Sequence, residues 1–350
     1  MAAKKKSKKT AKKTGKKKSA AKKKPARKPA KKKPAKKKAA KKKAAKKKAA
    51  KKASAPAKKP ARDLGPAVTA QRAFSLTAST ETVSGPGVAA SLPQHVLKRG
   101  KKAFIVTDQG VRGAGIVAPI VDVLEKASVQ THVFDQVSPN PTDVNVTAGV
   151  AALNRFGLEG TVVVFIGGGS VMDCGKYIAL AAPNGVDNLN LAFAPNLDAN
   201  DRIDFGTLAP KAQASKPGLP TIAIPTTSGT ASETNGGGLI TDTLSNPKVH
   251  RKLTFSNPTV APAVILLDPT LTVGMPARGT AACGMDVLTH AIECYTSANS
   301  NPYADALALH AIRLTGQWLP KVVADGTDLD RKSTRLNSSH SSVSRMPSSA

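Results

Sequence analysis

Three short segments of the chain carry side chains suited to holding a cofactor or a metal ion. GGGS at residues 167–170 and PTTSGTASE at residues 225–233 are rich in glycine and hydroxyl groups, and a third segment contains Asp286 and His290. Glycines let a backbone approach a phosphate closely, and amides at a helix N-terminus donate to it. Hydroxyl groups donate to phosphate, ribose or nicotinamide. An aspartate and a histidine at i and i+4 share one helix face, and this pair suits Fe²⁺ or Zn²⁺.

Each of these patterns has a purely structural alternative when it is taken alone. A glycine run after a strand is equally typical of a tight strand-to-helix turn without a ligand. An Asp-x-x-x-His pair is more often a polar pair on a helix surface than a metal site. The order and the surroundings of the segments therefore have to decide between the two interpretations.

Apolar patterns predict the elements that position these segments. Buried strands are expected at residues 102–108, 131–134, 161–166, 221–224 and 264–267. Helices are expected at residues 116–126, 144–156 and 173–182, with Pro119 in a first turn. This alternation predicts a parallel sheet with helices on both faces. Because α/β sheets bind ligands at the carboxyl ends of their strands, the glycine and threonine segments are expected at one site.

Taken together, the segments resemble the iron-containing (group III) alcohol dehydrogenase family. The resemblance rests on DQVSPNP at 135–141, GGGSVMDCGK at 167–176, PTTSGTASE at 225–233 and GMDVLTHAIE at 284–293, and it covers about residues 70–330. It implies a Rossmann-like parallel-sheet domain that binds NAD, followed by an all-helical, metal-binding domain of the dehydroquinate synthase-like type. The helical domain is expected to be incomplete in this chain.

The resemblance also implies roles for particular residues. Gly168, Gly169 and Ser170 would contact the pyrophosphate, and Thr226 and Thr227 the nicotinamide or ribose side. A hydrogen bond from an adenosine ribose hydroxyl to an aspartate would favour NAD over NADP, because a carboxylate repels a 2′-phosphate. A lysine would reach toward the cofactor, with a solvated surface lysine as the alternative. The cofactor-binding residues expected on this basis are Asp135, Gly168, Gly169, Ser170, Asp173, Thr226, Thr227 and Lys252.

For the metal, the resemblance implies that Asp286 and His290 are ligands, with Fe²⁺ favoured and Zn²⁺ as the alternative. The family has two further histidines downstream, and neither His310 nor His340 matches those positions. Two protein ligands seldom hold a catalytic ion. We therefore expect this chain to carry part of the metal shell, and we assign no catalytic proton-relay residue.

Charge and composition divide the chain into four parts. Residues 1–62 hold 32 Lys and Arg without Asp or Glu, whereas the other 288 residues hold 22 basic and 22 acidic residues. We expect a disordered cationic tail at 1–62, a dinucleotide-binding α/β domain at 63–270, the start of a helical metal and substrate domain at 271–330, and a Ser-rich end at 331–350. That end is expected to be non-native, with a genuine Ser-rich tail as the alternative.

The sequence predicts a metal-dependent oxidoreductase that transfers a hydride between a small alcohol or aldehyde and NAD. One alternative is a Zn²⁺ enzyme of the same fold, such as glycerol dehydrogenase. The other is a histone-like protein that binds nucleic acid through residues 1–62 and carries a vestigial enzyme body. Three cysteines without a disulfide pattern predict a reducing, cytoplasmic setting, and the lack of a long apolar run predicts no membrane span. Nucleoid association through the tail and assembly into homo-oligomers are both compatible with the sequence.

Removal of residues 1–62 is expected to abolish retention on heparin and DNA and to leave turnover unchanged. Full-length protein should lose affinity with salt at a log–log slope of about −0.9 for each phosphate that the tail neutralises. Salt elution from both matrices and steady-state turnover of the two chains check this. A large loss of turnover on removal would contradict the independence of the tail.

Overall fold

The structure, a computed structural model, describes residues 80–197, 203–245, 248–298 and 300–327. The segments 1–62 and 331–350, predicted to be a cationic tail and a non-native end, lie outside the described residues. The proposed domain limits at residues 63, 270 and 330 stay predictions.

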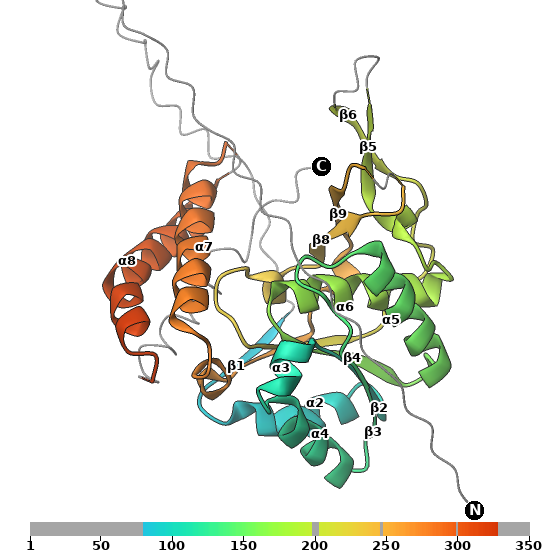
Figure 1. Ribbon diagram of the computed structural model, residues 1–350, viewed down its shortest axis with the longest axis horizontal. Helices are drawn as coiled ribbons and strands as arrows, with labels where there is room; N and C mark the ends of the chain where they lie inside the picture. Colours follow the sequence, from blue (N-terminus) through green and yellow to red (C-terminus); the bar gives the residue numbers. More distant parts are fainter. Residues whose placement is uncertain (1–79, 198–202, 246–247, 299, 328–350) are drawn as a thin grey trace, which may run out of the picture. The chain divides into compact units, whose positions relative to one another are not determined.

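A parallel sheet of six strands forms the centre of the described part of the chain (Figure 1). Every pair of neighbouring strands in it is parallel. In spatial order the strands are β1 (Glu81–Ser84), β10 (Val264–Leu267), β7 (Thr221–Pro225), β4 (Thr161–Gly167), β2 (Lys102–Val106) and β3 (Gln130–Phe134). The five predicted strands are confirmed, and β1 is an additional edge strand.

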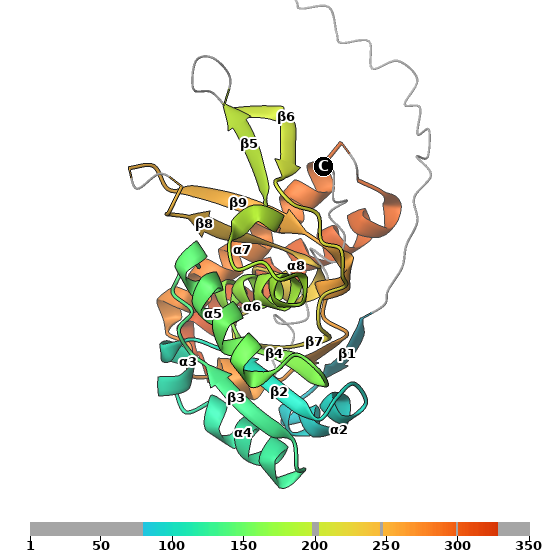
Figure 2. The same ribbon diagram turned by 90° about the vertical axis from the view of Figure 1, so that its right-hand side faces the viewer.

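Helices cover both faces of this sheet, as predicted (Figures 1 and 2). One face packs on α2 (Leu92–Leu97) and α4 (Val117–Lys126), and the other on α5 (Asp143–Phe156) and α6 (Gly169–Ala181). Successive residues of each strand alternate between the two cores. Ala103 and Ile105 belong to the α4 side, whereas Phe104 and Val106 belong to the α6 side.

Short elements join these strands and helices. They are α3 (Gln109–Gly113) and the 3₁₀ turns η1 (Val88–Ser91), η2 (Ala182–Asn184), η3 (Leu189–Leu191), η4 (Ser232–Thr234), η5 (Pro258–Val260) and η6 (Pro269–Thr272). Pro119 lies in the first turn of α4, as its missing N–H requires.

A second sheet of four antiparallel strands was not predicted. In spatial order it contains β6 (Ile203–Pro210), β5 (Phe193–Leu197), β9 (Arg251–Ser256) and β8 (Gly237–Asp242). Only β9 carries a clear signal, because Leu253 and Phe255 are buried while Lys252, Thr254 and Ser256 are exposed. Strand β8 packs on α6, so this sheet adds a layer beside the helix that follows the glycine segment.

Two long helices follow the sheets, as predicted for the helical region. They are α7 (Ala277–Thr296) and α8 (Pro302–Ala324), and they pack on one another through small side chains. Those side chains are Val287, Ala291, Cys294, Ala304, Ala308 and Ala311. None of the helices in the described ranges is long and apolar enough to span a bilayer.

A substitution at Phe165 tests how the central strand β4 packs against α6. Its ring is fully buried on β4, and a Cβ added at Gly175 of α6 would lie 2.5 Å from it. Phe165→Ala is expected to lower the free energy of unfolding by about 3–5 kcal/mol. Leu239→Ala, at a residue that is 45% exposed, should change it by less than about 1 kcal/mol. Urea unfolding followed by far-UV circular dichroism measures both, and equal effects would contradict this packing.

Candidate active site

The strand order of the parallel sheet reverses between β2 and β4, at their carboxyl ends. The chain passes from β2 to β3 on one side and then crosses to β4 on the other side of β2. At such a reversal the loops after the two strands diverge, and open α/β sheets bind ligands there. Residues 107–108 follow β2, and residues 167–170, which we call the glycine loop, follow β4. The predicted glycine segment therefore lies at the switch point of the sheet.

The glycine loop leads directly into α6, which begins at Gly169 and not at residue 173 as predicted. The prediction was wrong because glycine is a poor helix former in helix interiors, whereas the first turn tolerates it. Gly168 is the N-cap, and no side chain caps this end of the helix. The amides of the first turn are therefore available to an anion. This arrangement fits the pyrophosphate contact predicted for Gly168, Gly169 and Ser170.

The threonine loop, residues 225–230, lies against the glycine loop. Gly167 and Pro225 are register partners on β4 and β7, and the Thr226 amide donates to the Gly167 carbonyl at 3.0 Å. A Cβ on Gly168 would lie 3.1 Å from Thr227 Oγ1, and a Cβ on Gly169 would lie 2.7 Å from Thr230 Cγ2. The structure thus brings the two predicted loops together, and only glycine leaves room for this approach.

Asn140 joins two further residues predicted to contact the cofactor. Its side-chain oxygen accepts a hydrogen bond from Lys252 Nζ at 2.8 Å, and its amide donates to Ser170 Oγ at 3.3 Å. Asn140 has a φ of 54°, a left-handed conformation that asparagine tolerates better than most residues. Lys252 therefore points toward the glycine loop rather than only into solvent. The sequence marked Asn140 only as part of the segment 135–141.

Two aspartates follow β2 and β3 at the same edge. Asp135, the predicted ribose ligand, accepts a hydrogen bond from Arg112 Nη1, and their side chains are 14% and 58% exposed. A ribose hydroxyl would have to share this carboxylate with the guanidinium. Asp108 caps α3 by accepting from the Val111 amide at 2.9 Å. It follows β2 next to the switch point, a placement that depends on strand order and has no local sequence signal.

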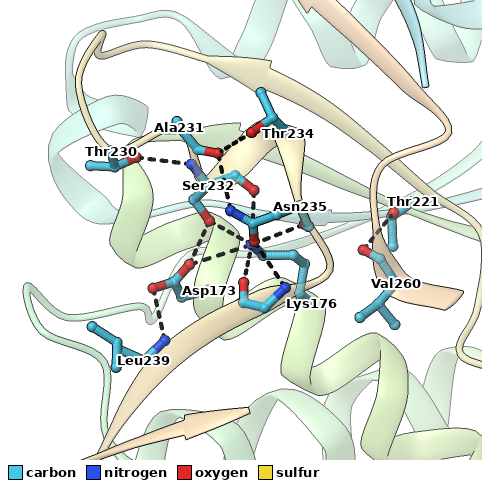
Figure 3. Close-up of polar contacts among 11 residues, drawn as sticks. Asp173, Lys176, Thr221, Thr230, Ala231, Ser232, Thr234, Asn235, Leu239 and Val260 are labelled. Atoms are coloured by element: carbon cyan, nitrogen blue, oxygen red, sulfur yellow. Dashed lines mark hydrogen bonds and ion pairs between the residues drawn. The ribbon is translucent and has the colours of Figure 1, made fainter. Parts of the chain in front are cut away.

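Asp173 is held by the protein itself (Figure 3). Its Oδ1 accepts from Ser232 Oγ, and its Oδ2 accepts from the Leu239 amide at 3.0 Å. These contacts join the second turn of α6 to η4 and β8. The predicted contact of Asp173 with the cofactor stays a prediction, and the contacts present are structural.

Lys176 and Glu233 are buried charged groups beside Asp173. Lys176 is fully buried and Glu233 is 1% exposed. Burial lowers the pKa of Lys176, while the nearby carboxylates of Asp173 and Glu233 act in the opposite direction. Burial raises the pKa of Glu233 to about 7, although Lys176 opposes that rise. Within the described part of the chain, Oε1 of Glu233 has no hydrogen-bond partner.

The predicted metal ligands lie together on α7. Asp286 Oδ1 and His290 Nε2 are 3.7 Å apart, and the side chains are 41% and 25% exposed. His290 Nδ1 lies 3.1 Å from the Gly229 carbonyl of the threonine loop. A carbonyl only accepts, so Nδ1 carries the proton and Nε2 keeps its lone pair for a metal. The pair fits half of a metal shell, and the described ranges contain no group of three or more His, Cys, Asp or Glu that could hold an ion.

Comparison with known proteins assigns the chain to a family. A sequence model of iron-containing alcohol dehydrogenases matches residues 79–269, and one of the C-terminal part of the Fe-containing alcohol dehydrogenase family matches residues 280–346. The chain belongs to the iron-containing alcohol dehydrogenase family. The second match runs through most of the segment predicted to be non-native, and that prediction stays open.

Individual members of the family are similar over much of this chain. The 1,3-propanediol dehydrogenase of Klebsiella pneumoniae is 38% identical over 235 residues, which are 67% of this chain and 55% of that protein. A 1,3-propanediol oxidoreductase crystal structure superposes with a TM-score of 0.67 at 34% identity, covering 77% of this chain and 65% of the other.

A sulfoacetaldehyde reductase from Bifidobacterium kashiwanohense, solved with NAD⁺, gives a TM-score of 0.65 at 26% identity, with coverages of 77% and 66%. The matched region is thus a little over half of the first curated relative and about two thirds of these solved chains.

Glu233 generates a prediction about pH. Its pKa in the folded chain, about 7, exceeds the ordinary 4.5, so folding favours its protonated form. Its contribution to stability is complete below about pH 4.5 and is lost as the pH rises through 7. The loss amounts to about 3 kcal/mol. The unmodified chain should therefore lose about this much stability between pH 5 and pH 8, whereas Glu233→Gln should not lose it. The free energy of unfolding of Glu233→Gln minus that of the unmodified chain should thus rise by roughly 3 kcal/mol over this range.

The difference between the two chains is the quantity to measure, by urea unfolding at each pH. His95 is buried with a lowered pKa, so its contribution changes in the opposite sense over this range, and it cancels in the difference. A difference that stays constant from pH 5 to pH 8 would contradict the assignment.

Proposed function

We propose that this chain carries the NAD-binding part and part of the metal site of an oxidoreductase that interconverts a small alcohol and its aldehyde. The observation that carries the proposal is the contact of His290 Nδ1 with the Gly229 carbonyl. It brings α7, the helix that carries the predicted metal ligands, against the loop that faces the glycine loop. The two groups that such a reaction needs would therefore lie next to each other.

Different residues of this chain would hold NAD and the metal ion. The amides of Gly168, Gly169 and Ser170 would bind the pyrophosphate, and Thr226 and Thr227 would hold the nicotinamide or ribose side. Asp286 and His290 would supply two metal ligands. When bound, a divalent metal supplies a Lewis acid and NAD supplies a hydride acceptor. The protein supplies the orientation that brings them together.

The identity of the metal and the setting are part of the proposal. A carboxylate and an imidazole accept both Fe²⁺ and Zn²⁺, and family membership supports Fe²⁺. The thiols of Cys174 and Cys294, which form no disulfide in the described part of the chain, support a reducing compartment such as the cytoplasm. Binding of nucleic acid by residues 1–62 and assembly into homo-oligomers stay predictions.

Two substitutions separate cofactor binding from metal function. Gly169→Ala places a Cβ 2.7 Å from Thr230 and should weaken NADH binding by about tenfold or more. His290→Ala should leave the NADH dissociation constant within about twofold, weaken binding of Fe²⁺ or Zn²⁺ by about tenfold or more, and with it remove any metal-dependent reduction of NAD⁺ by 1,3-propanediol or ethanol. NADH fluorescence gives the first quantity, and calorimetric titration with Fe²⁺ or Zn²⁺ gives the second.

Gly113→Ala is the matched control, because a Cβ there meets nothing within 4 Å. It should change neither quantity. Failure of the unmodified chain to bind NADH would overturn the proposal. Metal binding that persists unweakened in His290→Ala would remove the metal assignment and leave the dinucleotide site standing.

A further inference from the structure

The threonine loop is anchored at both ends, and its second anchor is a lysine on the helix that follows the glycine loop. At its first end, β7 pairs with β4 up to Pro225. At its other end, the chain enters η4 at Ser232, whose carbonyl and hydroxyl both accept hydrogen bonds from Lys176 Nζ (Figure 3). We propose that Lys176 is a positioning residue, which fixes the threonine loop against the N-terminus of α6 so that the nicotinamide half of the dinucleotide can be held. This inference rests on the proposed function.

The geometry around Lys176 Nζ matches the needs of an ammonium group. An ammonium has three protons to donate. Its three nearest acceptors are the Ser232 carbonyl at 2.8 Å, Ser232 Oγ at 2.7 Å and the Gly237 carbonyl, which lies closer still. The two oxygens of Asn235 lie at 3.3 and 3.4 Å. Lys176 therefore holds both η4 and the start of β8, at sequence separations of 56 to 61 residues.

Asp173 adds a second tie from the same helix. It lies one turn before Lys176, with 3.5 Å between Oδ1 and Nζ, and accepts a hydrogen bond from Ser232 Oγ. Its other oxygen accepts from the Leu239 amide. Two consecutive turns of α6 are thus bonded to the segment that follows the threonine loop. Any shift of that segment relative to the glycine loop would break several charge-assisted hydrogen bonds.

The backbone between the loop and this anchor is strained. Ala231 has a φ of 50°, a left-handed conformation in which the Cβ of an L-residue crowds the following carbonyl oxygen. Its carbonyl accepts from the Thr234 amide at 3.0 Å and from Thr234 Oγ1 at 2.8 Å. The anchor at Ser232 follows immediately. Strain of this kind persists only where the surroundings impose it, and it accumulates at ligand-binding sites.

A fully buried lysine is a poor choice for stability alone. Apolar side chains of similar volume commonly replace buried charges without loss, because removing an ion from water costs several kcal/mol. What a charge adds is a fixed geometry between groups far apart in the chain. The residues between the two anchors, 226–230, include Thr226 and Thr227, which are expected to contact the cofactor, so the geometry being fixed is that of the proposed site.

The test compares two ligands that differ only in the part that the threonine loop would hold. ADP carries the adenosine and the pyrophosphate, whereas NADH adds the nicotinamide half. In Lys176→Met the dissociation constant for NADH should rise by about tenfold or more, and that for ADP should stay within about twofold. Lys176→Arg, which keeps the charge, should recover most of the NADH affinity. Fluorescence titration of the full chain with NADH, and displacement by ADP, give both constants.

Two further variants keep the result decisive. Ser232→Ala removes one acceptor of Lys176 and the donor to Asp173, and it should raise the NADH constant selectively, even where Lys176→Met fails to fold. Lys102→Met removes a lysine at the opposite end of β2, where its Nζ lies 5.8 Å from the Phe156 ring, and should change neither constant. Thermal unfolding of each variant shows that the comparison is made on folded protein.

The outcomes separate this inference from the function on which it rests. Equal weakening of NADH and ADP, or unchanged NADH binding in both Lys176→Met and Ser232→Ala, would overturn the positioning role and assign Lys176 to the core alone. An unmodified chain that binds ADP but not NADH, or neither, would instead overturn the proposed function.

Discussion

The close approach of two backbone segments is the constraint on which the rest of this site depends. The glycine loop and the threonine loop end neighbouring parallel strands, and the Thr226 amide bonds directly to the Gly167 carbonyl. No side chain fits between them at Gly169. Because the loops touch through main chain and short side chains, small displacements alter the space for a ligand directly. The layers around the loops, α6 and β8 on one side and α7 at Gly229, act by limiting those displacements.

Few charged side chains are buried in the described part of the chain. Lys176 and Glu233 lie in the buried cluster beside the threonine loop, and Asp173, which is 18% exposed, completes it. Each of these groups is costly to bury, and their mutual attraction offsets only part of that cost. The same cluster joins α6 to the second sheet. The segment that holds the threonine loop in place therefore also contains a carboxyl group, Glu233, whose raised pKa makes stability depend on pH.

The sequence predicted the parallel sheet because its inner strands β2, β4, β7 and β10 are largely apolar runs, buried on both faces, and because helical spacing separates several of the predicted strands. It did not predict the second sheet, since β5 contains Pro195 and β6 contains Gly206, residues that weaken a strand signal, and only β9 alternates clearly. The i, i+4 spacing of Asp286 and His290 was enough to predict that they share one helix face. The Gly229 carbonyl that orients His290 lies 61 residues away in sequence, so no local pattern could predict that contact. The contacts of Lys176 are equally distant in sequence. Spacing predicts neighbours on one element, and contacts between elements require the fold.

The edge strand β1 has a consequence for how the chain acquires this fold. Its partner is β10, and Thr80 Oγ1 bonds to the Pro262 carbonyl across 182 residues of chain. At roughly 5–20 residues per second, synthesis of that interval takes about 10–40 s, during which β1 has no partner strand. Pairing over such a separation also closes a large loop, which slows folding. The first strand of the described part of the chain is thus among the last to join the sheet, and until it does so the outer edge of β10 is open to pairing with competing strands.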